Sequence, residues 1–396
     1  MSNGLLRERR AGRHAEVTSV ELFFDLVFVI AVTQVSHSLL EHLTWVGALQ
    51  SAMLLLTIWW AWIDTAWITN WLDPQKPLVR LLLFTLMGIG LVISSSLPEA
   101  FGERGLAFAM AFVVFQLGRT AFMLWAVRDD ESLTRNFVRI AIWYGASAVF
   151  WLAGGFAEGE LRLYLWLVAV VLDASSAIAN FWVPGLGRSD THEWTIDGGL
   201  MADRNGLFIL IALGESILVT GTAFTQLEWN WPLIIAMTVS LLQSIAMWWI
   251  YFGQHARAAE AAIARHDDPG GLARFAYTYV PILLVAGIVV SAVGDEIVLS
   301  HPEGHIETAV QLVLIGGPAL FLVGAVLFKR AVFHYWSIPR LCGLVATLAL
   351  YPFASGMTPL LLSAATTAIM VALATWEVVD IARHPERFPA MHEQAE

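Results

Sequence analysis

Stretches of about twenty mostly apolar residues, separated by short polar segments, run through almost the whole chain. A helix needs about 20 such residues to cross the hydrocarbon core of a bilayer. Twelve windows of this kind can be drawn, at 20–40, 46–71, 78–97, 105–127, 136–155, 161–183, 205–226, 232–253, 275–294, 308–328, 340–356 and 358–379. The pattern predicts an all-α integral membrane protein with about twelve transmembrane helices.

Composition supports this prediction and excludes other classes. Of 396 residues, 58% are hydrophobic and 14% are charged, against roughly 25% charged in ordinary globular chains, so a soluble enzyme is not expected. The net charge of −11 and the lack of a basic run with interleaved aromatic residues argue against nucleic-acid binding. A single cysteine, Cys342, excludes a disulfide framework. No Walker loop, HExxH or GxSxG motif occurs in the chain, and no cofactor or metal is expected.

Basic residues predict the orientation, because Lys and Arg accumulate on the cytoplasmic side of membrane proteins. With both termini in the cytoplasm, Arg104 and Arg162 lie outside, Arg119 lies within a span, and the other nineteen of 22 Lys and Arg residues lie inside. The predicted outer loops carry acids instead: Glu41, Glu99, Glu103, Glu158, Glu160, Asp295, Glu296 and Glu303. We expect a multi-pass protein of the cytoplasmic membrane.

Sequence landmarks recur in the two halves of the chain. Asp25 is followed 34 residues later by a Trp-Trp pair (59–60), and Glu215 is followed 33 residues later by the other such pair (248–249). In the third span of each half a glycine precedes a glutamate by nine residues: Gly90 and Glu99, then Gly287 and Glu296. This periodicity indicates an internal duplication.

The duplication predicts a domain organisation. Residues 1–183 form a first six-span repeat, residues 184–204 a cytoplasmic linker, and residues 205–396 a second six-span repeat with a short cytoplasmic tail. Because each repeat has an even number of spans, both face the same way, and the fold class is two parallel six-helix repeats related by an axis along the membrane normal.

Two motifs resemble those of a known family. The first motif, at 20–28, reads VELFFDLVF. The second has two parts, RNGLF at 204–208 and LGESIL at 213–218. Both motifs are similar to the signatures of the bacterial low temperature requirement protein A family, and the resemblance covers nearly the whole chain. It implies a multi-spanning membrane protein associated with growth in the cold. Where the family often has a His and a Glu before the Arg-x-Gly, this chain has Leu200 and Asp203, so a proton-handling histidine is not implied here.

Asp25, Asp64, Arg119, Asp173 and Glu215 all fall inside predicted spans, near the midplane or in the inner half. A charge at the centre of a bilayer costs about 2.5–3.5 kcal/mol or more unless it is paired or hydrated. Four acids against one base leave an excess of negative charge, so either some acids are protonated or a cation balances them.

Helical periodicity extends the candidate substrate- or ion-binding set by two residues. At 100° per residue, Glu21 lies on the same face as Asp25, and Arg204 lies on the same face as Glu215. Asp25 and Glu215 either bind protons or a cation or hold the bundle together. Arg119 is either the counter-charge of a buried acid or the anchor of an anionic substrate.

Three functions remain open at this level. The first is a secondary transporter or permease coupled to protons or a small cation, with an unknown small-molecule substrate. The alternative is a non-transporting protein for membrane structure or adaptation. A membrane-embedded enzyme is less favoured, because the reactive groups are scattered among the helices. Apart from the lipid bilayer, no partner, substrate or oligomeric state can be named from the sequence.

Overall fold

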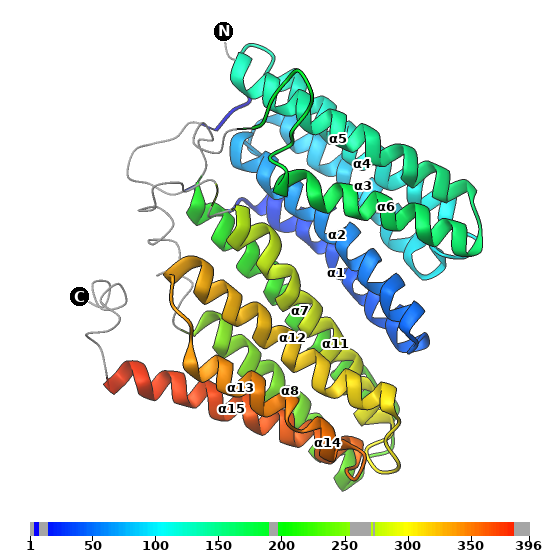
Figure 1. Cartoon of the computed structure of the whole chain (residues 1–396), viewed down its shortest axis with the longest axis vertical. Helices are drawn as coiled ribbons and strands as arrows, with labels where there is room; N and C mark the ends of the chain where they lie inside the picture. The colour runs from blue at the N-terminus through cyan, green and yellow to red at the C-terminus, as the bar shows by residue number, and fades with distance from the viewer. Residues whose placement is uncertain (1–3, 8–14, 190–196, 254–270, 272–273, 384–396) are drawn as a thin grey trace. The chain divides into compact units, whose positions relative to one another are not determined.

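The computed structural model describes residues 4–7, 15–189, 197–253, 271 and 274–383 (Figure 1). These residues are almost entirely helical and contain no β-strand. The chain divides into two compact units, residues 1–201 and 202–396. The boundary between the units falls in the predicted linker 184–204, close to the start of helix α7.

The first unit contains six long helices and one short 3-10 helix. They are α1 (Ser19–Glu41), α2 (Trp45–Trp71), α3 (Pro77–Ser96), η1 (Leu97–Glu99), α4 (Gly105–Ala126), α5 (Glu131–Phe156) and α6 (Gly159–Ile178). Within this unit α1 packs against α2 and α3, α4 packs against α3 and α5, and α6 packs against α5 and α2.

The second unit contains five long helices, a broken helix and a π-helical turn. They are α7 (Gly198–Gln226), α8 (Trp231–Phe252), η3 (Phe275–Tyr279), α11 (Val280–Ser300), α12 (Thr308–Phe333), α13 (Ile338–Leu348), α14 (Tyr351–Ala354) and α15 (Pro359–Arg383). The pair α11 and α12 packs closely, and α15 packs against α8, α12 and α13.

Local sequence signals explain where several helices begin and end. The side chains of Asp130 and Asn230 accept hydrogen bonds from backbone amides in the first turns of α5 and α8, as N-cap residues do. Asp197 does the same for α7, through the Leu200 amide, so α7 begins in the segment predicted as a linker. Helix α6 ends before the predicted residue 183, because Asn180 and Phe181 adopt positive φ values of 54° and 48°.

Eleven helices in the described residues are long and apolar enough to cross a membrane, one fewer than predicted. The predicted span 340–356 is instead divided into α13 and α14. Pro352 explains the break: a proline lacks the backbone N–H, and its ring clashes with the carbonyl four residues earlier, which is that of Leu348, where α13 ends.

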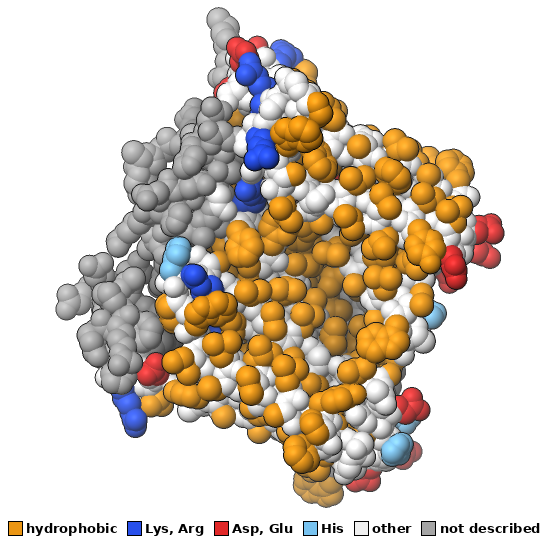
Figure 2. All heavy atoms as spheres, viewed as in Figure 1, with side chains coloured by type: hydrophobic (Ala, Val, Ile, Leu, Met, Phe, Trp, Pro, Cys, Tyr) orange, Lys and Arg blue, Asp and Glu red, His pale blue; other side chains and the backbone are white. Residues whose placement is uncertain are grey.

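Side chains on the outer faces of the helices are apolar. On α1, Leu22, Phe23, Leu26 and Ile30 are each more than 40% exposed and recur at helical spacing. Figure 2 shows hydrophobic side chains covering most of the visible surface along the helices, with charged side chains gathered at the helix ends. Such a surface suits lipid rather than water.

The α11–α12 contact depends on a glycine and gives a first prediction. A Cβ atom at Gly287 would lie 2.4 Å from the backbone nitrogen of Phe321 on α12, whereas a Cβ atom at Gly316 meets nothing within 4 Å. We expect Gly287→Ala to destabilise the protein by about 1–3 kcal/mol through overpacking, and Gly316→Ala to leave stability unchanged or slightly raised. Unfolding of both variants in detergent checks this, and equal stability would refute the packing argument.

Candidate functional site

An ion pair lies inside the first unit, between α2 and α4. The Arg119 Nη2 atom donates to Asp64 Oδ2 at 3.0 Å, and the hydroxyl of Tyr144 on α5 donates to the same oxygen at 2.5 Å. Arg119 also donates to the Ala61 carbonyl, the Thr65 hydroxyl and the Gln116 side chain. This is the geometry expected of a buried counter-charge, because the guanidinium engages one carboxylate and several neutral oxygens.

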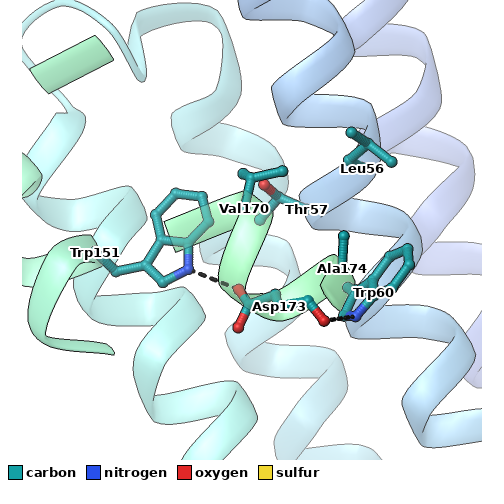
Figure 3. A pocket seen from close by; sticks show the side chains of 7 residues that line it. All are labelled: Leu56, Thr57, Trp60, Trp151, Val170, Asp173 and Ala174. Carbon is teal, nitrogen blue, oxygen red and sulfur yellow. Dashed lines mark hydrogen bonds between the residues drawn. The ribbon is translucent and has the colours of Figure 1, made fainter. Parts of the chain in front are cut away.

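Asp173 on α6 occupies a different environment, beside a small pocket between α2, α5 and α6 (Figure 3). Its Oδ2 atom accepts a hydrogen bond of 2.9 Å from the Trp151 indole, and its backbone carbonyl accepts one of 3.0 Å from Trp60. The Oδ1 atom is buried and makes no hydrogen bond of ordinary geometry, although the Ser147 hydroxyl also acts on this carboxylate. The pocket has a volume of about 10 Å³, roughly the size that admits one water molecule. Its lining residues are Leu56, Thr57, Trp60, Trp151, Val170, Asp173 and Ala174.

The pocket and the ion pair belong to one electrostatic network. The Asp173 carboxylate interacts with both Asp64 and Arg119, and Tyr144 interacts with all three charged groups. Two acids and one base therefore lie together in the interior of the first unit. The indole that binds Asp173 is a neutral donor, so the formal charge of the network is −1.

Asp25 and Glu21 lie one turn apart on α1, and their surroundings differ. Asp25 is buried and accepts a hydrogen bond of 2.8 Å from the Trp62 indole. Glu21 belongs to a capping box with Thr18 at the start of α1. Both of its carboxylate oxygens also accept hydrogen bonds of 2.9 Å from Arg7. Glu21 thus fixes the N-terminal segment to the end of the bundle, a role that its shared face with Asp25 did not indicate.

Arg204 and Glu215 lie on α7 in the second unit, with 0% and 2% of their surface exposed. The structure therefore places both residues in the protein interior, as their common face predicts. The joint use of Asp25 and Glu215 as one site stays a prediction, because the two residues belong to different units.

Sequence reasoning missed two buried polar clusters in the second unit. Asp295 was expected in an outer loop, but this is wrong, because α11 continues to Ser300 and the side chain is only 2% exposed. Its carboxylate accepts a hydrogen bond of 2.9 Å from Ser216 on α7. The spacing of Ser291 and Asp295, one helical turn apart, is the signal that could have placed it in a helix.

The second missed cluster surrounds Glu377 on α15. Its carboxylate accepts hydrogen bonds from Lys329 at 2.6 Å, from Arg340 at 2.9 and 3.1 Å, and from Ser337 at 3.2 Å. Arg340 also donates to the carbonyls of Ala325 and Ile250. These contacts tie α8, α12, α13 and α15 together at one end of the second unit.

The fold and the buried charge networks define a class, the all-helical, multi-spanning membrane proteins with ionisable side chains in their interior. The chain matches the family described as bacterial low temperature requirement A protein (LtrA) over residues 16–375. It therefore belongs to the LtrA family, as its motifs indicated.

A relative in Rhizobium meliloti (strain 1021) is 38% identical over 376 residues, which cover 93% of this chain and 90% of the relative. Its name, uncharacterized protein RA0937, states no activity. No solved structure matches the chain. The argument for a function therefore depends on the residues of the site.

Proposed function

We propose that this LtrA-family protein is a secondary transporter or permease, coupled to protons or a small cation and acting on a small molecule that is not yet identified. The observation that carries the proposal is the buried carboxylate of Asp173, which lines a water-sized pocket and is hydrogen-bonded by neutral donors alone. A carboxylate in a membrane interior is costly unless a proton or a cation neutralises it. Reversible neutralisation of such a group is the elementary step of ion-coupled transport. The proposal assigns no enzymatic activity to the chain.

The neighbouring ion pair supports the same proposal. Arg119 already engages Asp64 at 3.0 Å, and Tyr144 supplies a further hydrogen bond to that acid. The charge of Asp173 is thus left to be balanced by something other than a fixed side chain. A proton or cation that reaches the pocket changes the net charge of the network from −1 to zero, which gives the site two states.

The proposal includes a topology in the cytoplasmic membrane, with both termini on the cytoplasmic side. It requires α13 and α14 to cross the bilayer together as a short twelfth span. Their 17 residues, Ile338–Ala354, extend about 25 Å at 1.5 Å per residue. Arg340 lies at the end of the unit where α8 terminates, whereas Ala354 packs in a cluster with Leu233 and Leu299 at the opposite end. Helices α13 and α14 therefore run from one end of the unit to the other, which supports a full crossing of the bilayer.

We further propose that the two units are parallel repeats. We match α1–α6, in order, to α7, α8, α11, α12, the broken helix α13–α14, and α15. Under this match, five pairs of contacting helices in the first unit have a contacting counterpart in the second. They are α3·α4 with α11·α12, α4·α5 with α12·α13, α5·α6 with α13·α15, α2·α6 with α8·α15, and α2·α4 with α8·α12. Individual landmarks have diverged, because Trp59 and Trp60 are buried whereas Trp248 and Trp249 are about 40% exposed. Helix order and packing support the duplication more strongly than single side chains do.

Cysteine accessibility tests whether the pocket communicates with water. Thr57 lines the pocket, and the native thiol, Cys342, can be replaced by alanine. We expect Thr57→Cys in this background to react with a small membrane-impermeant thiosulfonate from at least one side of the membrane. The control is Leu83→Cys on α3, a fully buried position outside the pocket lining, which should stay unreactive. If both cysteines are equally inert, the pocket has no aqueous path and the transport proposal fails.

Flux measurements test the role of Asp173 directly. Proteoliposomes containing a pH-sensitive dye are given a membrane potential and then a panel of cations and small solutes. We expect at least one of these cations or solutes to drive proton movement in the wild-type protein. Asp173→Asn should reduce that proton flux at least tenfold, because the titratable carboxylate is lost. Asp130→Asn, which removes the N-cap carboxylate at the start of α5, is the matched control. Equal flux from Asp173→Asn and the wild type, with normal folding, would contradict the assignment.

A second candidate function is a non-transporting role in membrane structure or adaptation. The guanidinium of Arg119, which already binds one acid and three neutral oxygens, favours it. Under this alternative, variants at Asp173 change stability but no flux. The accessibility experiment separates the two functions, because only transport requires water to reach the pocket.

A further inference from the structure

The carboxylate of Asp295 on α11 is surrounded by hydroxyl groups from two other helices of the second unit. Ser216 on α7 donates to its Oδ2 atom at 2.9 Å, and the Ser216 oxygen lies 3.0 Å from that of Ser244 on α8. Ser240, one turn before Ser244 on the same face of α8, interacts with the same carboxylate. All four side chains are more than nine-tenths buried.

Among the described residues, no basic side chain acts on the Asp295 carboxylate. The groups that act on the Asp295 carboxylate, within the described part of the chain, are the hydroxyls of Ser216 and Ser240. Hydroxyls satisfy hydrogen bonds but do not neutralise charge. Because an isolated ionised carboxylate is very costly in a protein interior, the cluster requires a positive charge that this part of the chain does not supply.

The hydroxyl of Ser240 indicates what kind of charge fits. Its oxygen is buried and acts on the carboxylate, but the two form no hydrogen bond of ordinary geometry. A proton on Asp295 would need only one of the neighbouring oxygens as its acceptor. A cation that is bound by several oxygens at once would use Ser240, Ser216, Ser244 and the carboxylate together.

The donor set also restricts the cation. Carboxylate and hydroxyl oxygens are hard ligands, which select alkali and alkaline-earth ions rather than soft transition metals. No group of three or more His, Cys, Asp or Glu residues suited to a metal occurs among the described residues. One carboxylate carries a single negative charge, which matches a monovalent ion. Hydroxyl hydrogens rotate freely, so each serine can turn a lone pair towards a central ion.

We propose that Asp295, Ser216, Ser240 and Ser244 form a binding site for a dehydrated sodium ion. Helices α7, α8 and α11 supply the ligands, so the ion would stabilise the packing of these three helices. Its use in coupling rests on the proposed transport function, but binding itself does not. The site is separate from the Asp173 pocket, which belongs to the first unit.

Ion-dependent stability of the purified, full-length protein tests the site. Thermal unfolding is measured in choline chloride, with NaCl or KCl replacing it at constant ionic strength. A ligand that binds only the folded state raises the unfolding temperature in a saturable way, so we expect NaCl to do so and choline not to. Direct binding of radioactive sodium to the same protein gives a second readout. An equal response to all three salts overturns the proposal.

Two variants locate the ion. Asp295→Asn removes the negative charge and should abolish the response to sodium. Ser240→Ala removes an oxygen that makes no hydrogen bond of ordinary geometry, so the unfolding temperature in choline should change little while the sodium concentration for half-saturation rises about tenfold. The matched control is Ser51→Ala on α2, another buried serine without a hydrogen bond, which should leave the sodium response intact. An unchanged response in Ser240→Ala and Asp295→Asn places sodium elsewhere and contradicts the site.

The outcomes also distinguish this site from the transport proposal. Sodium binding that depends on Asp295, together with an inert cysteine at position 57, supports the ion site and refutes transport through the Asp173 pocket. Stabilisation by low pH alone, with no effect of sodium, makes Asp295 a proton site and overturns the sodium proposal.

Discussion

Replacing Arg119 by methionine is expected to destabilise the protein by about 3 kcal/mol. Removing one partner of a buried ion pair costs about 3–5 kcal/mol, because the remaining charge is left uncompensated. Asp64 would keep the hydrogen bond from the Tyr144 hydroxyl but would lose the positive charge beside it. The lower end of the range applies, because the Asp64 side chain retains 19% exposure. Unfolding by SDS in mixed micelles measures the difference in free energy.

Two further variants isolate the charge effect in Arg119→Met. The double variant Arg119→Met, Asp64→Asn removes both charges and should recover most of the lost stability. Arg135→Met breaks the pair between Arg135 and Glu131, which are 55% and 88% exposed, and should change stability by less than about 1 kcal/mol. If Arg119→Met is no more destabilising than Arg135→Met, the buried pair does not hold α2 and α4 together.

Replacing Glu377 by glutamine is expected to have the largest effect on folding, about 3–5 kcal/mol. Glu377 is the acid that pairs with both Lys329 and Arg340 in the interior of the second unit. Without its charge, Lys329 and Arg340 are left to repel each other, with the partly buried Asp380 as the nearby acid. The yield of folded protein on size-exclusion chromatography and the free energy of unfolding in mixed micelles both measure this effect.

The control for Glu377→Gln lies on the same helix. Asp380, one turn further along α15, is only partly buried, and Asp380→Asn should cost much less. Adding Lys329→Met to Glu377→Gln removes one of the two cations and should restore part of the stability. Comparable losses from Glu377→Gln and Asp380→Asn would mean that the cluster is dispensable.

Helix positions were largely predictable, because the apolar length that crosses a bilayer and the residues that cap a helix are local properties. The exceptions have local causes as well. Pro352 divides the predicted span 340–356, and Asn180 ends α6 early through its positive φ value. Both residues are visible in the sequence, but a hydropathy window averages over them.

The candidate site was predictable in its residue types and not in its partners. Asp64, Arg119 and Asp173 were all expected inside the membrane, and the structure brings them into one network. Nothing in their spacing indicates that Arg119 engages Asp64 and leaves Asp173 to neutral donors. Asp295 was missed because the predicted span stopped at residue 294, six residues before the end of α11, and so moved a buried acid into a loop.

The sequence by itself determined the class of protein, its family, most helix boundaries and the need for a polar interior. Composition, apolar length and capping act over a few residues along the chain, so they can be read from it. Only the tertiary structure decided which charges pair, which carboxylate is left to neutral donors, and which serines surround Asp295. Those contacts join residues tens of positions apart, and they depend on how the helices pack and rotate against one another.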